Sequence, residues 1–504
     1  MNRDAVIFFA TLFLIACLGV VIRWHFALEP LWIDELHTAW STDPQITFFQ
    51  MIDRAGQGNQ TPLYFAIAWT IQTALGFSEL VLRSTSLLAA LLAIIVAAIW
   101  VRNSTRSSAC GLVTATLLAA DYWAIIYGSE ARPYALVQLL AIVQTSSLFQ
   151  EHRYNNNRKD RNPRISWQLF FTTACLLLTH LSTILLVAAQ VLFILIQHKH
   201  FNLRRITYSF AAAFLSLAIS FPVVSQVLYN RSDWSSVYRI HDLLQAVWPS
   251  LIAAVFIPGI ISIWGNPKRH PIWLLGACST IPLIIVVVMQ LTGFATAASY
   301  RYVCYATPLA TIFAGLAVGT LNSRSHRIAV SICIVLIAIT ANPLTRNTAS
   351  FYSYGFRQEN WQQTVSKLNE FNTGKSQLVF LFPNLIEDHR LQTEHTDKFS
   401  QYISFPLTSA YRLNPESTIV PMPTITAKPR WSAEHIESII ANDGCEIAAR
   451  ADKHLFAQIL NELTQTASDQ KAEFNIQIFE QDMNVVRIAR VTLVERRTSS
   501  DGPD

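Results

Sequence analysis

The sequence predicts a mostly α-helical fold: a polytopic transmembrane bundle of about 11 spans with interfacial helices, followed by a small extracytoplasmic α/β domain. The composition is the first reason, because 52% of the 504 residues are hydrophobic and only 14% are charged, whereas soluble domains carry about 25% charged residues. The second reason is that long apolar runs recur through the first two thirds of the chain and then stop. The net charge of +5 does not indicate a nucleic-acid partner, since basic residues also collect in the cytoplasmic loops of membrane proteins.

Each apolar run is measured against the roughly 20 residues that a helix needs to cross the hydrocarbon core. The first run has no small-residue cleavage site and is followed by Arg23, so it is interpreted as a retained span and not as a signal peptide. Two short runs meet at Thr179-His180, which predicts a tight hairpin. The seven cysteines show neither a disulfide framework nor a metal-type spacing. The expected spans are 5–23, 80–101, 109–127, 133–149, 167–180, 181–197, 206–227, 243–264, 271–292, 303–321 and 328–343.

The distribution of basic residues predicts the orientation: N-terminus inside, C-terminus outside, and residues 62–77 as an interfacial helix. If 62–77 crossed the membrane, every later loop would lie on the opposite side, and the basic residues would no longer be concentrated in the cytoplasmic loops. The 15 residues then expected on the cytoplasmic side are Arg3, Arg102, Arg106, Arg153, Arg158, Lys159, Arg161, Arg164, Lys199, Arg204, Arg205, Lys268, Arg269, Arg324 and Arg327. The 7 expected on the outer side are Arg23, Arg54, Arg83, Arg132, Arg231, Arg239 and Arg301.

The last third of the chain is polar and contains no expected span, which predicts a separate domain outside the membrane. Its short apolar runs are typical of strands, and Ser432 suits the N-cap of a helix. The expected strands are 377–382, 474–479 and 484–494, and the expected helices are 432–441 and 454–466. The expected domains are 1–345, transmembrane with catalytic outer loops 24–79 and 128–133; 350–496, extracytoplasmic α/β; and 497–504, a disordered tail.

The strongest indication of chemistry is the acidic pair Asp34-Glu35, about ten residues after the first span. A carboxylate can take a proton from an acceptor hydroxyl, and Glu130 in a second outer loop is a further candidate. Basic and aromatic side chains on the same face suit an anionic, lipid-anchored substrate, because an arginine can hold a phosphate through a bidentate fork. The candidate substrate-binding residues are Arg132, Tyr134, His180, Arg301 and Tyr302.

The residues of the first two outer loops also have a structural interpretation. Asp34 and Glu35 suit the first turn of a helix that begins there, because acidic residues favour helix N-termini. Glu130 and Arg132 have the spacing of a solvated loop pair. On local sequence alone, the cap interpretation of the acidic pair is as good as the catalytic one, and the loop-pair interpretation of Glu130 and Arg132 is the better one.

Three further polar residues also have a structural interpretation beside a functional one. His180 suits the polar tip of a hairpin, and Arg301 between two tyrosines suits an anchor at the membrane interface. Asp121 falls inside the third expected span, where a carboxylate that faces lipid costs free energy. Since it lies toward the outer end of that span, Asp121 is expected to line a cavity or reach the surface.

In the order of its elements, the chain resembles the C-type superfamily of polytopic glycosyltransferases, in particular its bacterial protein O-mannosyltransferase-like and aminoarabinose-transferase-like branch. The resemblance runs through the whole chain and is most specific over 31–136. Thr61-Pro62 replaces the family's Pro-Pro, and the Lys-Pro of the aminoarabinose branch is absent, so lipid A is not indicated as the acceptor. The matching segments are 32–35, 60–64, 76–83 and 129–136, with looser matches at Thr179-His180 and Arg301-Tyr302, and Asn360-Trp361 at the start of a C-terminal domain.

The resemblance implies a multi-pass enzyme of the cytoplasmic membrane, part of cell-envelope glycosylation. It would take a sugar from a polyprenyl-phosphate donor on the outer face and pass it to a lipid, glycan or protein acceptor, with inversion. Asp34 would be the base or lie beside the reacting hydroxyl, and Glu130 would help to shape the same site. No metal ligand is assigned, although the resemblance leaves a divalent metal open because some C-type relatives bind one.

Two other classes of protein are weighed against this one. A transporter or flippase for lipid-linked saccharides tends to show repeated halves and polar residues at the bilayer midplane. The sequence shows no repeat, and most of its charges lie at span ends. A scaffolding membrane protein whose outer domain binds a partner would leave Asp34-Glu35 and the segment 130–133 unexplained.

Overall fold

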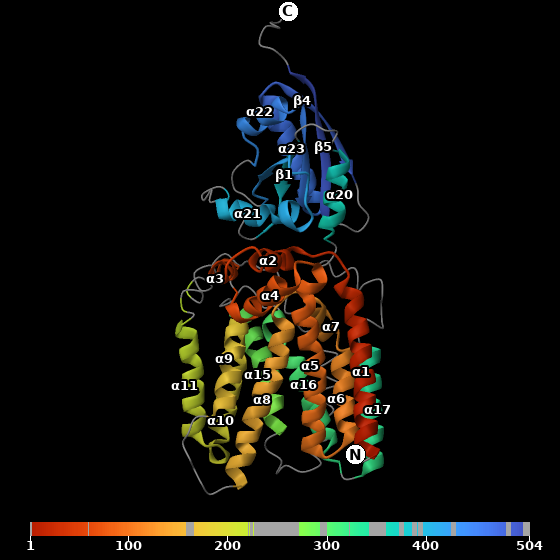
Figure 1. Cartoon of the computed structure of the whole chain (residues 1–504), viewed down its shortest axis with the longest axis vertical. Helices are drawn as coiled ribbons and strands as arrows, with labels where there is room; N and C mark the ends of the chain where they lie inside the picture. Colours follow the sequence, from red (N-terminus) through yellow and green to blue (C-terminus); the bar gives the residue numbers. More distant parts are fainter. Residues whose placement is uncertain are drawn as a thin grey trace, which may run out of the picture. The chain divides into compact units, whose positions relative to one another are not determined.

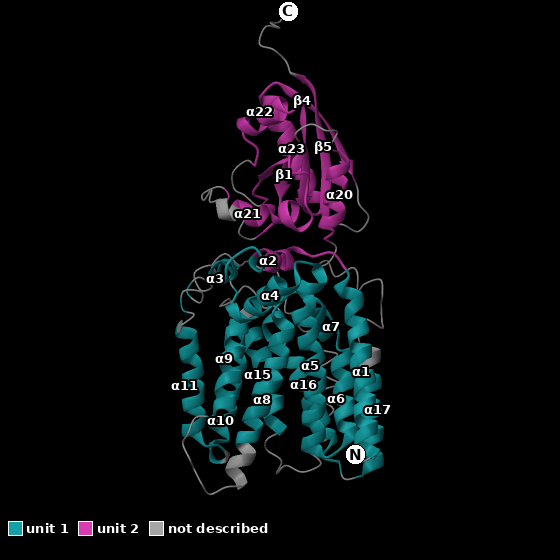
Figure 2. Cartoon of the chain, viewed as in Figure 1, with its two compact units in different colours: residues 1–28, 41–351 teal, residues 29–40, 352–504 magenta. Residues whose placement is uncertain are grey.

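The structure is a computed structural model that divides into two compact units (Figure 2). The helical unit comprises residues 1–28 and 41–351, and the C-terminal unit comprises residues 29–40 and 352–504. The segment with Asp34 and Glu35 thus groups with the C-terminal unit, whereas the sequence prediction assigned all of 24–79 to the transmembrane domain. The residues that the structure describes are 3–58, 60–157, 166–219, 221, 225, 272–292, 300–321, 323–341, 359–371, 377–385, 391, 397–424, 430–479 and 485–496.

The helical unit is built around α16 (Ala306–Val318), in which every residue is buried (Figure 1). Small residues allow this close packing: a Cβ on Gly315 would lie 2.1 Å from the Thr114 hydroxyl oxygen. The other helices described in this unit are α1 (Arg3–Ala27), α3 (Phe48–Gln57), α4 (Pro62–Leu75), α5 (Glu79–Thr105), α6 (Ser108–Ala120), α7 (Tyr122–Ser129), α8 (Tyr134–Asn157), α9 (Trp167–Thr179), α10 (Ile184–Ile196), α11 (Leu203–Ile219), α15 (Ile272–Leu291) and α17 (Arg324–Ala341).

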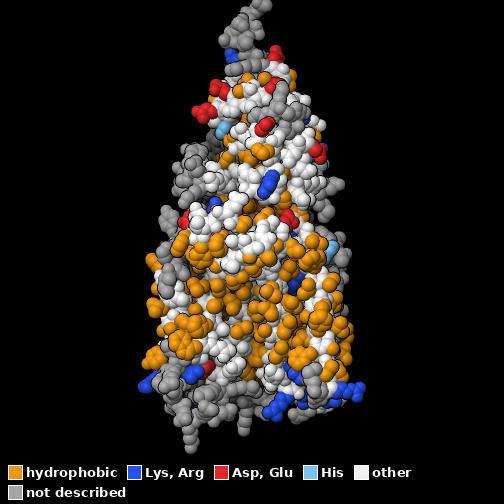
Figure 3. Space-filling view, viewed as in Figure 1, with side chains coloured by type: hydrophobic (Ala, Val, Ile, Leu, Met, Phe, Trp, Pro, Cys, Tyr) orange, Lys and Arg blue, Asp and Glu red, His pale blue; other side chains and the backbone are white. Residues whose placement is uncertain are grey.

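Several of these helices have the properties of membrane spans. Within the described residues, α1, α5 and Ile272–Met289 of α15 are long and apolar enough to cross a membrane, and the bent pair α6 and α7 is a fourth candidate. Large apolar side chains such as Phe13, Leu195 and Leu291 are exposed, as expected of lipid-facing surfaces, and Figure 3 shows hydrophobic side chains over the visible face of this unit. The count of 11 spans remains a prediction, and the expected span 243–264 lies outside the described residues.

The third expected span, 109–127, is broken at Asp121 into two helices inclined by 62°. Asp121 caps α7, because its Oδ2 accepts a hydrogen bond from the Ala124 N–H at 2.8 Å. The break leaves carbonyl groups at the end of α6 without helical partners. Arg23 of α1 donates to two of them, the oxygens of Leu118 at 3.3 Å and Ala119 at 3.2 Å. Asp121 is therefore buried as a helix cap between α6 and α7.

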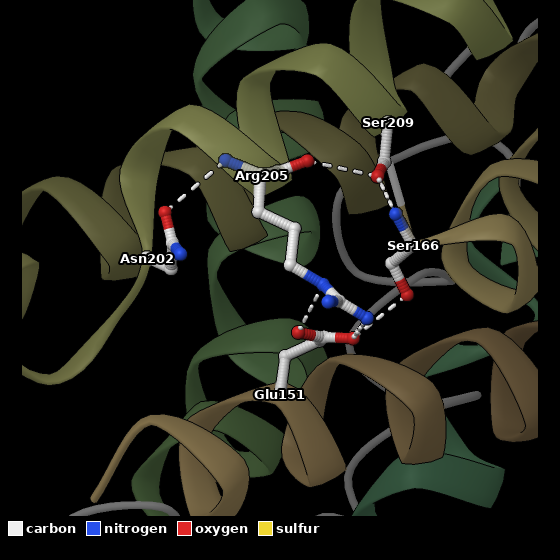
Figure 4. Close-up of polar contacts among 5 residues, drawn as sticks. All are labelled: Glu151, Ser166, Asn202, Arg205 and Ser209. Atoms are coloured by element: carbon white, nitrogen blue, oxygen red, sulfur yellow. Dashed lines mark hydrogen bonds and ion pairs between the residues drawn. The ribbon is translucent and has the colours of Figure 1, made fainter. Parts of the chain in front are cut away.

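The C-terminal end of α8 carries an ion-pair network (Figure 4). The Glu151 carboxylate lies 2.9 Å from Arg205 Nε and accepts a hydrogen bond from the Ser166 hydroxyl at 2.7 Å. These contacts join α8 to the starts of α9 and α11. At the opposite end of α9, the ring of His180 lies 5.8 Å from the ring of Tyr134, at the start of α8. α9 therefore runs antiparallel to α8, and the chain reverses direction at His180, as the sequence predicts.

The C-terminal unit contains a five-stranded sheet in the order β2-β1-β3-β5-β4. β1 pairs in parallel with β2 and β3, and the other two pairings are antiparallel. Ile436, Ile459 and Leu463 from the helices pack with Phe380 and Ile447 of the sheet in one hydrophobic core. The elements are α2 (Ile33–Ser41), α20 (Trp361–Phe371), β1 (Leu378–Phe382), α21 (Asp397–Phe405), β2 (Thr418–Pro421), α22 (Ala433–Ala441), β3 (Gly444–Arg450), α23 (Lys453–Asp469), β4 (Ala472–Phe479) and β5 (Val486–Arg496).

The elements expected between 377 and 494 are present with small shifts at their ends, and Ser432 forms the expected cap of α22 with His435. β3 was not predicted, because its sequence is rich in alanine, which has little preference for strands. Gly444 begins β3 at φ 140°, where a Cβ would lie 2.4 Å from the Val491 carbonyl oxygen. The tail 497–504 lies outside the described residues, and the side of the membrane on which this unit lies remains a prediction.

Candidate active site

Arg132 and Tyr134 are positioned by the short connection between α7 and α8. The Ser86 hydroxyl of α5 donates to the Arg132 carbonyl oxygen at 3.0 Å, and the Tyr64 hydroxyl of α4 lies 2.9 Å from the same Ser86 oxygen. The guanidinium carbon of Arg132 lies 5.9 Å from the centroid of the Tyr134 ring, within the range of a cation–π contact. Glu130 and Arg132 are only 4% and 5% exposed, so the interpretation of a solvated loop pair is wrong.

His180 occupies the turn between α9 and α10 and connects two of the predicted substrate-binding residues. Its ring lies 5.8 Å from Tyr134 and 6.1 Å from Tyr302. Its Nδ1 accepts a hydrogen bond from the Ser182 N–H, which leaves the proton of the neutral ring on Nε2. Burial lowers the pKa of His180, and the positive charges of Arg132 and Arg301 lower it further. His180 is therefore a neutral hydrogen-bond donor at physiological pH.

Beside these residues lies a group of stacked aromatic rings that the sequence analysis missed. Trp123 and Tyr127 of α7 are stacked with their ring centroids 5.5 Å apart, and Tyr127 lies 4.7 Å from Tyr134. Tyr300 stacks on Tyr127 at 6.2 Å, and Glu130 acts electrostatically on the Tyr127 hydroxyl. The available signal was the spacing of Trp123 and Tyr127, since residues four apart share one face of a helix.

The predicted residues of the helical unit thus converge at one end of α8. Arg132, Arg301 and His180 supply two guanidinium groups and one neutral N–H donor, with tyrosine rings around them. Guanidinium groups match the geometry of a phosphate through paired N–H donors. Chemically, this arrangement can bind an anionic group and offer aromatic faces to the less polar part of the same ligand.

Asp34 and Glu35 lie in the first turn of α2, in the C-terminal unit. Asp34 is half-buried and Glu35 is fully buried. A position in the first turn fits the helix-dipole interpretation of these acids. It is equally compatible with catalysis, because a half-buried carboxylate can still meet a substrate.

The structure adds Glu359, a residue that the sequence analysis did not select, next to the acidic pair. Glu359 is 2% exposed, and its Oε2 accepts a hydrogen bond from the Ile33 N–H at 2.8 Å, at the start of α2. Arg450 pairs with its Oε1. Burial raises the pKa of Glu359, while Arg450 opposes that shift. No local signal in the sequence marks Glu359, because its partners are 326 and 91 residues away.

The acidic and histidine side chains described above are not arranged as a set of metal ligands. Within the part of the chain that the structure describes, no group of three or more His, Cys, Asp or Glu side chains has the arrangement of a metal site. The nearest set by sequence, Asp34 with Glu35, provides two carboxylates on adjacent residues of one helix turn.

Comparison with known proteins gives its clearest result for structure. The chain is similar to ArnT from Cupriavidus metallidurans in the apo state, with 12% identity, a TM-score of 0.56, and coverage of 95% of this chain and 97% of that one. It is also similar to the same ArnT bound to undecaprenyl phosphate, with 12% identity, a TM-score of 0.55 and coverage of 99% of both chains. The archaeal oligosaccharyltransferase AglB from Archaeoglobus fulgidus matches with 10% identity and a TM-score of 0.47, too low to carry an argument. No family model and no curated protein matched the chain.

These likenesses define the fold class of the whole chain. A helical unit and a smaller α/β unit, aligned over almost the full length of ArnT, give this chain the ArnT fold. The likeness agrees with the fold that the sequence predicts, a helical bundle followed by a small α/β domain. At 12% identity the comparison does not extend to the substrate, and the activity is argued from the residues of the site.

Proposed function

We propose that this protein is an inverting glycosyltransferase of the cytoplasmic membrane. It transfers a sugar from a polyprenyl-phosphate carrier to an acceptor on the outer face. The observation that carries the proposal is the convergence of Arg132, Arg301 and neutral His180 at one end of α8. It occurs in a chain with the fold of ArnT, which has been solved with undecaprenyl phosphate bound.

The arginines are proposed to hold the carrier phosphate. Polyprenyl phosphate is the leaving group, and its negative charge grows as the bond to the sugar breaks. Guanidinium groups and the Nε2–H of His180 would stabilise that charge, which is the type of electrostatic help that contributes most to many enzymes. Because the leaving group is already stable as an anion, the mechanism requires no strong acid.

Asp34 is proposed as the general base. Its carboxylate accepts the proton of the acceptor hydroxyl while the hydroxyl oxygen forms a bond to the anomeric carbon. The bond from the anomeric carbon to the phosphate oxygen breaks, and its electron pair leaves with polyprenyl phosphate. A single displacement of this kind inverts the configuration of the sugar and forms no covalent sugar–enzyme adduct.

The Asp34→Asn variant tests this assignment. Asparagine keeps the shape of the side chain but cannot accept the proton, so turnover should fall by about 10²–10⁴-fold while the affinity for the donor is retained. Glu35→Gln serves as the matched variant and should reduce turnover less. A greater loss in Glu35→Gln would move the base to Glu35. Near-normal turnover of a folded and inserted Asp34→Asn protein would favour the helix-dipole interpretation instead.

A further inference from the structure

The start of α2 is bound by a residue from a distant part of the chain. Trp32 is the residue before the helix, and its carbonyl oxygen accepts hydrogen bonds from the N–H groups of Glu35 and Leu36 at 2.9 Å. Residues at this position usually cap the first N–H groups through a side-chain oxygen. The indole of tryptophan has only a donor and cannot do so. The Ile33 N–H, at the start of α2, can therefore be capped by a side chain from another part of the chain.

Glu359 provides that acceptor from 326 residues away. Its Oε2 accepts the Ile33 N–H at 2.8 Å and the Trp361 indole N–H at 3.2 Å. The Oε1 pairs with Arg450, whose Nη1 also donates to the Asn384 carbonyl oxygen at 3.1 Å. The carboxylate is thus held between α20 and β3 and presented to the start of α2, one residue before Asp34.

Further contacts attach the rest of α2 to the same unit. The Leu31 N–H donates to the Tyr411 hydroxyl oxygen at 2.9 Å. Toward the other end of the helix, the ring of Tyr402 lies 5.3 Å from the ring of His37 and 4.9 Å from that of Trp40. Backbone bonds at the start and ring contacts at the end fix both the position of α2 and its rotation about the helix axis.

We propose that Glu359 is a positioning residue for the acidic helix: through the Ile33 N–H it sets the position of Asp34. This inference rests on the proposed function, because it gives Glu359 its role through Asp34. The expected effect is large, since a misplacement of about 1 Å at a reacting group can cost on the order of 10²-fold in rate.

The first arm of the test measures the anchor without any assay of activity. Hydrogen–deuterium exchange of the full-length protein is followed in the peptide that contains residues 31–41. In Glu359→Ala the start of α2 should lose protection. Glu359→Gln keeps an oxygen for the Ile33 N–H but loses both the charge and the acceptor opposite Arg450, so the start of α2 should stay closer to wild type than in Glu359→Ala. Glu370→Ala is the matched control, because Glu370 is an exposed glutamate of α20, the helix that begins just after Glu359.

The second arm measures catalysis in the same variants. Glu359→Ala should reduce kcat by about 10²-fold while KM for the donor changes by less than about twofold, because the arginines that bind the carrier belong to the helical unit. Glu359→Gln should recover most of kcat. A purely structural role would instead reduce the amount of folded protein and leave kcat per folded molecule unchanged.

The outcomes separate this inference from the proposed function. Unchanged exchange over 31–41 together with normal kcat in Glu359→Ala would overturn the inference while the transferase activity stands. If Glu359→Ala increased exchange over the entire C-terminal unit, the Glu359→Gln variant would decide between the two roles. A Glu359→Gln protein with normal exchange in α2 but a tenfold lower kcat would contradict positioning through the Ile33 N–H. A wild-type protein without transfer would defeat the proposed function and the catalytic role of Glu359 with it, although the exchange would still measure the anchor.

Discussion

The two ends of α8 contain charged groups in different arrangements. At Glu151, opposite charges pair at 2.9 Å, and a serine hydroxyl bonds the same carboxylate (Figure 4). At Tyr134, two charges of the same sign, on Arg132 and Arg301, act on one neutral histidine beside aromatic rings. An ion pair between helices holds them together, whereas guanidinium groups beside aromatic rings can contact an anionic ligand. The first end is thus suited to stability and the second to a ligand.

The same two ends also differ in surface charge. Glu151 lies 17 residues along α8 from Tyr134, or about 25 Å at 1.5 Å per residue, close to the roughly 30 Å of the hydrocarbon core. Arg23, Arg83 and Arg132, which the sequence analysis assigned to outer loops, are at most 5% exposed. Exposed basic residues described in the helical unit include Arg3, Arg106, Lys199, Arg204 and Arg324, and Figure 3 shows Lys and Arg side chains gathered at the lower end of this unit. By the positive-inside rule, the Glu151 end is expected to face the cytoplasm.

Cysteine labelling tests the assignment of the two ends to opposite sides of the membrane. Thr73→Cys on α4 and Ser107→Cys after α5 are introduced into a background without the exposed Cys17 and Cys333. A membrane-impermeant maleimide added outside should label Thr73→Cys in full and leave Ser107→Cys unlabelled until the membrane is opened. Ser468→Cys in the C-terminal unit should behave like Thr73→Cys. Labelling of Ser107→Cys and Ser468→Cys from one side would break the topology.

Arg→Lys substitutions at the Tyr134 end test its role as an anion site. Lysine keeps the charge but loses the planar fork, so kcat/KM for the donor should fall by roughly 10-fold to 100-fold if an interaction of about 1.5–3 kcal/mol is lost. Arg301→Lys is the more informative variant because Arg301 is half-buried and less constrained by packing than Arg132. Arg106→Lys at the other end is the control. Normal donor use by both Arg301→Lys and Arg132→Lys would move the phosphate contact elsewhere.

Substitution of Arg205 tests the opposite expectation at the Glu151 end. Arg205→Gln removes the ion pair with Glu151, and the side chains of the pair are 23% and 13% exposed. The free energy of unfolding should fall by about 1.5–3 kcal/mol, the range for a hydrogen bond to a charged group. Thermal unfolding in lipid nanodiscs should therefore occur at lower temperature, with kcat/KM of the folded protein unchanged. Arg204→Gln, an exposed neighbour, is the control, and a specific loss of donor use in Arg205→Gln would contradict the comparison.

Local signals were enough to predict the helices, the hairpin at His180 and most of the sheet. Hydrophobic runs and their ends are properties of short segments, which a sequence displays directly. The placement of Arg132, His180 and Arg301 on one face was predicted from the expected ends of the spans, because nothing local relates residues so far apart. Glu359 and the ring of Trp123 were missed because burial and partners across hundreds of residues decide their roles. The cap function of Asp121 was missed because its helix break has no proline or glycine to mark it.

The central claim is that this chain breaks the bond between a sugar and its polyprenyl phosphate. The purified full-length protein in lipid nanodiscs or liposomes would be offered a panel of polyprenyl-phosphate sugars with lipid, glycan and peptide acceptors. The account predicts release of polyprenyl phosphate with at least one donor, in equal amount to the sugar transferred, and a large loss of this release in Asp34→Asn. Movement of the intact donor between the two leaflets without any release would contradict the account and identify a flippase.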